Sequence, residues 1–528
     1  MPTPQKSAPS PVRTVSLMIG ATAVAKALGM VRMMCFARFY GDGEAAAAFS
    51  TALDLPLTFF DLLLGAAIAG CFIPAYNSFF KGLGSGEGEK ADAFASVFLN
   101  TILLLTGAMT LAGMVFTDAI VALAAPGFDA GTAALAAGLL RVMFPMVMFT
   151  GATYVATGIL QSKGEFLVPA LVSAVSNAGV ILYFLFLDAR FGVYGLAAAY
   201  LASWAVQLAT LVYPLYKKGF RYKIRLGLKN PAMGRAFKSA LPVMAGSWLV
   251  PAVLLMGARF ASTYEETGPS VMAFKYSTQL FLLITGILTY GICNYVFPRF
   301  SRLEAEGRGG DHASAVSSAL GASSALMLPV AAGAAVLGPE AVCAAFMRGQ
   351  FTPESAELTA SLLVWLTPCV LFISFIEILN RAFYSKGLTL VPMIASFAGI
   401  GGYAAAATVL RMAGIGLPGL ALSLTLSAAV SCAVLITAAA VRLRGSVTAA
   451  LIADGAKSLV CSGISFAVML TLRGVIGGSA YARGLLANVA VAGAVLAAGM
   501  VVYVVLSVAA GTSQFKPVRD KVRGMLGK

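Results

Sequence analysis

The residues of this chain that could do chemistry are the few charged side chains within its long apolar segments. Lys26 and Arg32 lie in the first apolar segment, and Asp54 and Asp61 lie in the second. A charge at bilayer depth costs about 2.5–3.5 kcal/mol on insertion scales, so such residues usually face a bundle interior or a water-filled cavity. Arginine suits a phosphate there, because its planar fork binds an oxyanion through two hydrogen bonds. The pattern indicates a cavity with fixed cations and an anionic substrate, such as an amphipathic lipid carrying phosphate or pyrophosphate.

The two cations of the first segment do not share a narrow stripe. Six residues separate Lys26 from Arg32, which places them about 120° apart around a helix. Both can face a wide cavity, especially if Gly29 between them permits a bend. We assign Lys26 and Arg32 to substrate binding and Gly29 to a hinge.

The two acids of the second segment do share a face. Seven residues bring Asp61 back to within about 20° of Asp54, and Pro56 between them loosens the helix, so we assign it to a hinge. Asp54 and Asp61 could pair with the cations across the bundle, or they could be proton or cation sites. The sequence leaves both alternatives open.

Two further pairs stand four residues apart, on one helix face each. Lys275 and Gln279 form the first pair, which we assign to the same cavity. Glu377 and Arg381 form the second, with the acid first, the favourable order for an intrahelical ion pair. This pair either neutralises itself or takes part in ion or proton binding.

No motif predicts an enzyme, a metal site or a nucleotide site. The single histidine, His312, lies in a polar stretch, and no HExxH, CxxC or GxxxxGK[ST] motif occurs. The seven cysteines are scattered, mostly in apolar segments, as small core residues are. We therefore expect a transporter without a cofactor and without an ATP site.

The elements that carry these residues must be membrane-spanning helices. Hydrophobic residues make up 59% of the 528 residues and charged residues 11%, against roughly 45–50% and about 25% in soluble proteins. A span needs about 20 apolar residues, whereas barrel strands read as alternating segments of about ten. The sequence thus predicts an all-α polytopic membrane protein with about fourteen transmembrane helices. They are expected at 14–39, 46–78, 92–117, 133–161, 167–187, 192–216, 236–262, 269–298, 313–338, 355–384, 388–410, 414–441, 449–472 and 485–510.

The basic residues outside these segments are distributed unequally between the two sides of the membrane. With fourteen spans, 24 of the 37 Lys and Arg fall on the side of the N-terminus and 6 on the far side. Because Lys and Arg collect in cytoplasmic loops, both termini are predicted to be cytoplasmic. The loop 217–238 alone carries eight basic residues. We interpret it as a topology signal in contact with anionic membrane lipids, and expect no nucleic acid.

The basic loop also divides the chain. The second apolar segment closes with CFIPAY (71–76), and the second segment after the loop closes with VFPRF (296–300). Parallel repeats of this kind are typical of transporters. We expect an N-terminal lobe over 1–230, a C-terminal lobe over 231–445, two extra helices over 446–512 and a basic cytoplasmic tail over 513–528.

Short motifs in order along the chain resemble the MurJ (MviN) lipid II flippases. They are AKALGMVR (25–32), ARFYG (37–41), LP (55–56), FIP (72–74), GILQ (158–161), GLA (195–197), RGQFT (348–352), RAFYS (381–385) and GLPGLAL (416–422). The resemblance implies the fold of the multidrug/oligosaccharidyl-lipid/polysaccharide exporters, with two six-helix lobes around a central cavity. The last two helices would form a groove for a lipid tail.

The resemblance also implies a function. The chain would move lipid II, the undecaprenyl-pyrophosphate-linked precursor of peptidoglycan, from the inner to the outer leaflet of the bacterial cytoplasmic membrane by alternating access. Membrane potential or an ion gradient would drive it, and proteins of cell-wall synthesis could be partners. The alternatives are a flippase for another polyprenyl-linked oligosaccharide of capsule or O-antigen, or a cation-coupled exporter of the same fold. A membrane glycosyltransferase or polymerase would need a sizeable loop outside the membrane, and the far-side loops are short.

The family's cavity residues carry over only in part. Arg32 matches a family arginine, and Lys26 keeps the charge of another. Two further family arginines fall at Phe60 and Gln279, and the acid that often follows the position of Arg32 is here Met33. Lys275 could restore a charge on the face of Gln279.

Overall fold

The computed structural model describes residues 11–65, 68, 72–78, 87–224, 241–266 and 268–525. Every element formed by these residues is helical. The second half of the basic loop, from residue 225 onwards, and Cys71 of the CFIPAY motif lie outside the described residues.

The chain divides into two compact units. The first comprises residues up to Tyr40, Ala45–Ala124 and Asp129–Met244, and the second comprises Gly41–Glu44, Ala125–Phe128 and Ala245–Lys528. The second unit therefore contains two short stretches that come from the N-terminal half of the sequence. It also contains the two C-terminal helices that the sequence sets apart.

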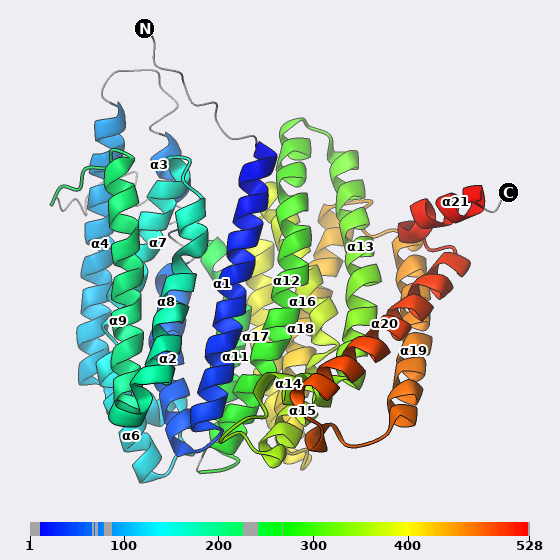
Figure 1. Cartoon of the computed structure of the whole chain (residues 1–528). Helices are drawn as coiled ribbons and strands as arrows, with labels where there is room; N and C mark the ends of the chain where they lie inside the picture. Colours follow the sequence, from blue (N-terminus) through cyan, green and yellow to red (C-terminus); the bar gives the residue numbers. More distant parts are fainter. Residues whose placement is uncertain are drawn as a thin grey trace, which may run out of the picture. The chain divides into compact units, whose positions relative to one another are not determined.

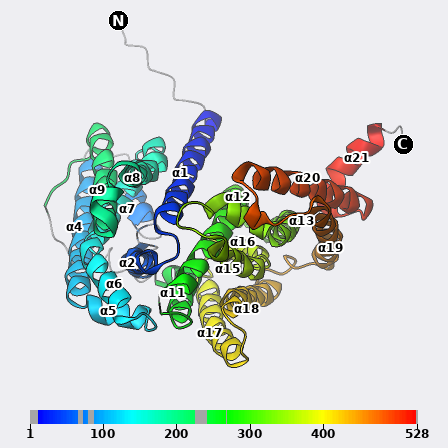
Figure 2. The ribbon, with the colours of Figure 1, turned by 60° about the horizontal axis from the view of Figure 1, so that its bottom comes forward.

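The first unit is built around a bundle of long helices. α1 packs on α8, α8 packs on α9, and α7 packs on both α4 and α9 (Figures 1 and 2). Its elements are α1 (Pro11–Tyr40), α2 (Glu44–Phe60), the π-helix η1 (Asp61–Gly65), α3 (Ile73–Ser78), α4 (Glu87–Val115), α5 (Thr117–Ala124), α6 (Ala130–Met143), α7 (Met146–Ser162), α8 (Leu167–Phe186) and α9 (Asp188–Lys217).

In the second unit, α17 and α18 lie side by side and α16 packs on α18 (Figure 2). The hairpin of α19 and α20 packs on α13 and α14, through a cluster of buried apolar side chains that includes Leu337, Met469 and Val495. The elements are α11 (Leu249–Ser262), α12 (Pro269–Ala305), α13 (Gly309–Val336), α14 (Gly338–Phe346), α15 (Pro353–Leu366), α16 (Cys369–Ser385), α17 (Leu390–Met412), α18 (Pro418–Arg442), α19 (Ala449–Ile476), η3 (Ala480–Ala482), α20 (Leu485–Ala509), η4 (Ser513–Phe515) and α21 (Lys516–Met525).

Each of the fourteen predicted apolar segments holds helix, but the count of fourteen spans is not confirmed. Within the described residues, eleven helices are long and apolar enough to cross a membrane, and two bent helix pairs raise the number to thirteen. The remaining segment, 236–262, contributes the shorter apolar helix Leu249–Ser262. The prediction of an all-α polytopic membrane protein is confirmed.

The two bent pairs are broken at prolines. The axes of α6 and α7 differ by 42°, and those of α15 and α16 by 49°. Pro145 directly precedes α7 and Pro368 directly precedes α16. A proline inside a helix removes a backbone donor and clashes with the preceding turn. The break falls in the fourth apolar segment of each half, which adds a second shared feature to the aromatic and proline motifs that suggested a repeat.

Two glycines allow the short N-terminal stretches to pack within the second unit. Gly41 has φ +59, and a Cβ there would lie 2.5 Å from the carbonyl oxygen of Gln350. The Tyr276 hydroxyl donates to the carbonyl of Gly41 at 2.7 Å. At Gly127 a Cβ would lie 1.9 Å from the carbonyl oxygen of Ser262. Only glycine fits these close approaches, and the first one joins the ARFYG and RGQFT motifs.

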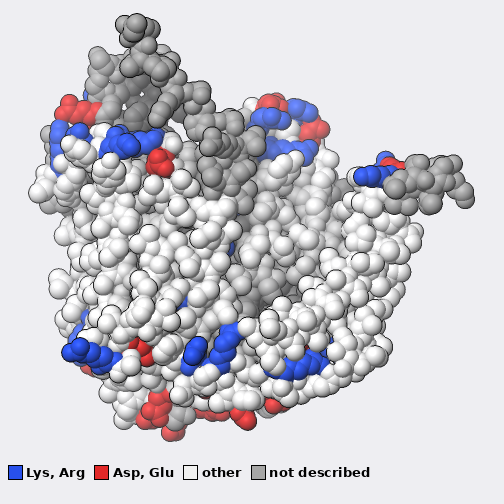
Figure 3. All heavy atoms as spheres, in the orientation of Figure 1, with Lys and Arg blue, Asp and Glu red and all other residues white. Residues whose placement is uncertain are grey.

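Charged side chains gather near the ends of the helices, and the visible surface between them is almost uncharged (Figure 3). Large apolar side chains such as Leu111, Phe186 and Val475 are exposed on the long helices. A contiguous apolar surface of this kind suits hydrocarbon rather than water.

Candidate functional site

Arg32 lies in the C-terminal half of α1 and is half-buried. Its guanidinium carbon is 5.3 Å from the centre of the Tyr200 ring on α9. A cation over an aromatic face is attracted by the ring quadrupole, so Tyr200 holds the guanidinium in place without neutralising it. The Arg32 Nε is buried and has no hydrogen-bond partner within the described part of the chain.

Tyr200 also brings Arg32 close to an acid. The Tyr200 ring is buried, packs edge to face against Phe49 at 5.2 Å, and feels the charges of both Arg32 and Asp54. Asp54 is half-buried in α2. The first unit thus gathers one predicted cation and one predicted acid around a tyrosine that the sequence analysis missed, since its position in an apolar segment of α9 gives no signal.

The other predicted residues of α1 lie differently. Lys26 is exposed. α1 continues as a helix through Gly29, where an added Cβ would lie 3.4 Å from the amide nitrogen of Asn177. That nitrogen donates to the carbonyl of Ala25 at 3.3 Å, so Asn177 joins α8 to α1. The hinge role of Gly29 stays a prediction.

Asp61 begins a π-helical turn. α2 contains Pro56 and ends at Phe60, and η1 runs from Asp61 to Gly65. Single π turns inside helices are frequent at functional sites. The side chain of Asp61 is exposed, whereas Asp54 is half-buried, so the two acids that share a predicted face have different surroundings.

Phe60, where the resemblance places a family arginine, is fully buried. Its ring packs edge to face against Tyr154 at 5.3 Å, and a Cβ on Gly151 would lie 3.4 Å from its Cε2. This position is filled by core packing within the first unit.

In the second unit, Lys275 and Gln279 are half-buried on the unbroken helix α12. Glu377 and Arg381 form an ion pair on α16, with the Arg381 guanidinium 2.5 Å from Glu377 Oε2 and 2.9 Å from the Glu377 carbonyl. Of the two roles that the sequence left open for these residues, the structure shows that they pair with each other. Arg381 and Glu377 also act electrostatically on Cys293 of α12.

Asp92 is a buried acid that the sequence analysis missed. It lies in the second turn of α4 and accepts three hydrogen bonds: from the Tyr76 hydroxyl at 3.2 Å, the Lys163 ammonium at 3.2 Å and the backbone amide of Arg221 at 3.1 Å. A buried charge needs such partners. Asp92 therefore ties the end of α3, the end of α7 and the beginning of the basic loop to α4.

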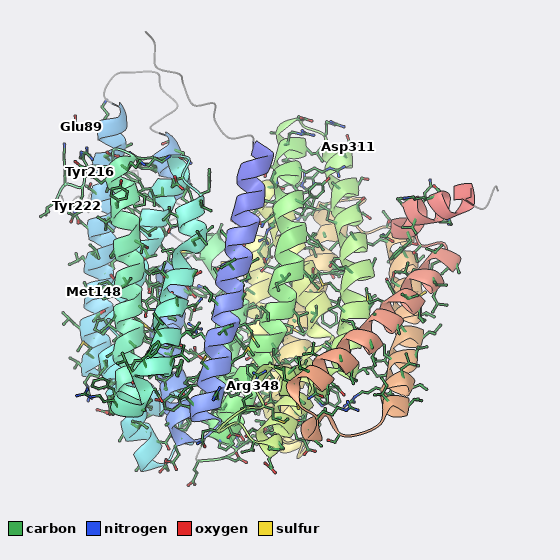
Figure 4. The ribbon with its side chains drawn as sticks, viewed as in Figure 1. Glu89, Met148, Tyr216, Tyr222, Asp311 and Arg348 are labelled. Carbon is green, nitrogen blue, oxygen red and sulfur yellow. The ribbon has the colours of Figure 1, made fainter. Side chains whose placement is uncertain are left out.

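Two more polar residues of α4 extend this contact. Ser96 and Asn100 follow Asp92 at intervals of four, so all three share one face. The amide of Lys223 donates to Ser96 Oγ at 3.2 Å, and the Tyr222 hydroxyl donates to Asn100 Oδ1 at 2.5 Å. Figure 4 shows Glu89, Tyr216 and Tyr222 close together at this end of α4 and α9. The first residues of the basic loop are thus held against the first unit.

Glu340 is a second missed acid. It is fully buried in α14 and accepts from Arg473 Nε at 2.8 Å, with the Arg483 guanidinium at 3.5 Å. Arg473 lies in the last turn of α19 and Arg483 in the connection to α20, so one carboxylate fixes both sides of the hairpin. Burial raises the pKa of Tyr481 in the same connection to about 12.

No group of three or more His, Cys, Asp or Glu residues with metal-binding geometry occurs among the residues that the structure describes. What the described residues offer is a half-buried guanidinium on an aromatic ring in the first unit. Such a group can bind an oxyanion.

Comparisons with known proteins give the family. Residues 36–507 match the protein family described as "Lipid II flippase MurJ". The chain is 24% identical over 429 residues to the probable lipid II flippase MurJ of Bdellovibrio bacteriovorus, covering 80% of this chain and 81% of that protein. It is 27% identical over 393 residues to that of Rhizobium meliloti, covering 72% and 71%.

Solved structures show the same fold. A lipid II flippase MurJ in an inward closed conformation matches with a TM-score of 0.76 at 19% identity, covering 96% of this chain and 100% of that one. An inward-facing multidrug resistance MATE family transporter of the MOP superfamily matches with a TM-score of 0.67 at 16% identity, covering 81% and 97%. The family match spans most of the chain and includes the helices that carry Tyr200, Lys275 and Glu377, so this chain belongs to the lipid II flippase MurJ family of membrane transporters.

Proposed function

We propose that this protein translocates lipid II, the undecaprenyl-pyrophosphate-linked precursor of peptidoglycan, from the inner to the outer leaflet by alternating access. The observation that carries the proposal is the position of the Arg32 guanidinium. Arg32 lies within a membrane-spanning helix, is held on Tyr200, and has a buried Nε without a hydrogen-bond partner among the described residues. A guanidinium in this position is suited to the two oxygens of a phosphate.

Arg32 is the residue of this site that would contact the pyrophosphate. Tyr200 positions it, and Asp54 moderates the local charge, so that the head group can leave after translocation. Lys26, Lys275 and Gln279 complete the proposed substrate-binding set. The C-terminal helices α19 and α20 would receive the polyprenyl tail, because their outer faces are apolar and exposed at residues such as Leu459, Val501 and Val505.

Membrane potential or an ion gradient would drive the cycle, with no cofactor. Asp54 and Asp61 are the proposed ion or proton sites, since Glu377 already pairs with Arg381. Proteins of cell-wall synthesis are the proposed protein partners. The bilayer would be the bacterial cytoplasmic membrane, with both termini inside.

The basic loop 217–238 would contact anionic lipids of the inner leaflet. Its described beginning places the exposed Lys217 next to the exposed aromatic rings of Tyr216 and Tyr213. Aromatic and basic side chains together are typical of a membrane–water interface.

One observation favours a second candidate, a flippase for another polyprenyl-linked oligosaccharide of the capsule or O-antigen type. The position of a family arginine is taken by Phe60, which is fully buried in the first unit. A head group with less negative charge needs fewer cations.

Complementation tests the proposal. The protein is expressed in bacteria depleted of their own lipid II flippase, with membrane insertion checked by blotting. Restored growth and labelled lipid II in the outer leaflet are expected. A well-inserted protein that restores neither would exclude lipid II flipping and leave the second candidate, which is tested in the same way in a strain lacking its capsule or O-antigen flippase.

A further inference from the structure

A polar cavity lies in the second unit at one end of α13 and α19, and none of its lining residues is among those assigned to the substrate. Its volume is about 570 Å³, within the range of small-molecule sites. α13 packs on α19 and also contacts α20 in this part of the second unit (Figure 1). It is lined by Ser314, Ser317, Ser318, Gly445, Thr448, Ala450, Leu451, Asp454, Ser513 and Gln514.

The walls are fixed by specific contacts. The Tyr503 hydroxyl of α20 donates to the carbonyl of Ala325 in α13 at 2.9 Å, and the Tyr503 ring packs edge to face against Phe515 at 5.9 Å. These contacts hold the segment after α20 against α13. Thr448 caps α19 by accepting from the amide of Leu451 at 3.1 Å. The cavity is thus bounded by elements with defined positions.

Asp454 is the one ionisable side chain in this lining, and no lysine or arginine belongs to it. The carboxylate is half-buried and accepts from the Ser513 hydroxyl. A carboxylate has about four acceptor positions, so most of them remain for a ligand. A half-buried carboxylate at the edge of a bilayer is stabilised by a cation that also donates hydrogen bonds.

The opposite wall offers hydroxyl groups. Ser314, Ser317 and Ser318 stand at i, i+3 and i+4 on α13 and therefore share a face. The Ser318 hydroxyl donates to the carbonyl of Ser314 within the helix at 2.9 Å. Hydroxyl groups can donate to phosphate oxygens without adding positive charge. Leu451 and Ala450 make the rest of the lining apolar.

We propose that this cavity binds the head group of a phospholipid that carries a primary ammonium group. The ammonium would pair with Asp454, and the phosphate would accept from the serine hydroxyl groups of α13. An anionic lipid would find a carboxylate and no lysine or arginine in the lining. A lipid without an amine would leave the Asp454 carboxylate with the Ser513 hydroxyl and without an ammonium partner.

The acyl chains would lie on the exposed apolar surface of the C-terminal hairpin, where Ile452 of α19 is exposed. A lipid bound here would pack against the C-terminal hairpin, whose outer face is also the proposed place of the polyprenyl tail. The proposal is independent of the identity of the transported substrate.

Native mass spectrometry of the purified full-length protein tests the proposal. The protein is incubated in detergent with equal amounts of phosphatidylethanolamine and phosphatidylglycerol. Preferential retention of phosphatidylethanolamine is expected, and Asp454→Asn should lower it about tenfold, as loss of one charge-assisted hydrogen bond does. Phosphatidylcholine, whose trimethylated ammonium cannot donate, should be retained less than phosphatidylethanolamine.

Asp520→Asn is the matched control, because Asp520 is exposed on α21 outside the cavity lining. It should leave lipid retention unchanged. Equal retention of the two lipids by the wild-type protein, or full retention by Asp454→Asn, would overturn the proposal. Should Asp454→Asn not fold, Ser317→Leu, which fills the hydroxyl wall and keeps the acid, is expected to show the same loss; if it too does not fold, the preference of the wild-type protein decides.

Discussion

At the scale of single residues, the most informative one is Arg32. The sequence predicts a cation at bilayer depth, and the structure adds the Tyr200 ring beneath the guanidinium. Lys26 carries the same charge on the same helix but is exposed. If charge alone bound the substrate, Lys26 and Arg32 would contribute equally to binding. If binding needs a fixed guanidinium that forms two hydrogen bonds to a phosphate, Arg32 contributes more than Lys26.

We expect Arg32→Ala to abolish complementation while the protein still inserts. A hydrogen bond between charged groups contributes about 1.5–3 kcal/mol, so the flipping rate should fall by about one to two orders of magnitude. Arg32→Lys should keep part of the activity, because it keeps the charge but loses the fork. Arg38→Ala, an exposed position on the same helix, is the control. Wild-type flipping by Arg32→Ala would exclude the phosphate-binding role.

Lys275 and Gln279 provide a second prediction at this scale. Lys275→Ala should impair complementation, since it removes a half-buried cation from α12. Adding Gln279→Arg should relieve the defect, because positions four apart present their side chains on one face. The readout is growth of the depleted strain at matched membrane levels. If the double variant grows no better than Lys275→Ala, the idea of compensation is wrong.

At the scale of elements, the C-terminal hairpin depends on one carboxylate. Glu340 of α14 is fully buried and faces Arg473 and Arg483, which come from the two sides of the hairpin. Removing one partner of a buried ion pair leaves an uncompensated charge. The hairpin would then be held chiefly by apolar packing around Met469 and Val495.

Glu340→Ala is expected to destabilise the second unit by roughly 3–5 kcal/mol, because two guanidinium groups lose their acid. Thermal unfolding of the purified protein in detergent measures the change. Glu357→Ala, an exposed acid on the neighbouring helix α15, should alter the melting temperature little. Equal melting temperatures for Glu340→Ala and Glu357→Ala would show that the ionic contact does not hold the hairpin.

The two bent helix pairs and the basic loop show which features of the helices and loops the sequence predicts and which it does not. Apolar length predicts helix in all fourteen segments, but the bends of 42° and 49° at α6–α7 and α15–α16 come from the prolines between them. The prolines are visible in the sequence, and the angles are set by packing. The basic loop is predicted to contact anionic lipids, and the structure adds that its beginning is bound to α4 by Asp92 and Ser96.

At the scale of the whole molecule, the charge distribution predicts a topology. The net charge of +15 becomes an excess of Lys and Arg on the side of both termini once the loops are sorted. The connection after α12 and the connection after α14 fall on opposite sides in this scheme, which makes the topology testable.

Cysteine substitutions with a membrane-impermeant thiol reagent measure this topology in intact cells. Glu306→Cys, in the connection between α12 and α13, should be labelled only after the membrane is permeabilised. Gln350→Cys, in the connection between α14 and α15, should be labelled in intact cells. Both positions are exposed, and the described native cysteines are buried or half-buried. The reverse pattern would invert the predicted orientation.

The sequence by itself determined the membrane environment, the helical class, the place of the helices and the family, because each follows from composition, apolar length or local motifs. It also marked Arg32, Asp54 and the pair of Glu377 and Arg381, since a charge in an apolar segment is visible without a structure. Only the tertiary structure identified the partners that give such charges a role. Tyr200 lies 168 positions after Arg32, and Arg473 lies 133 positions after Glu340. Contacts over such separations are set by which helices pack together, and apolar periodicity, which is similar in every span, does not encode that choice.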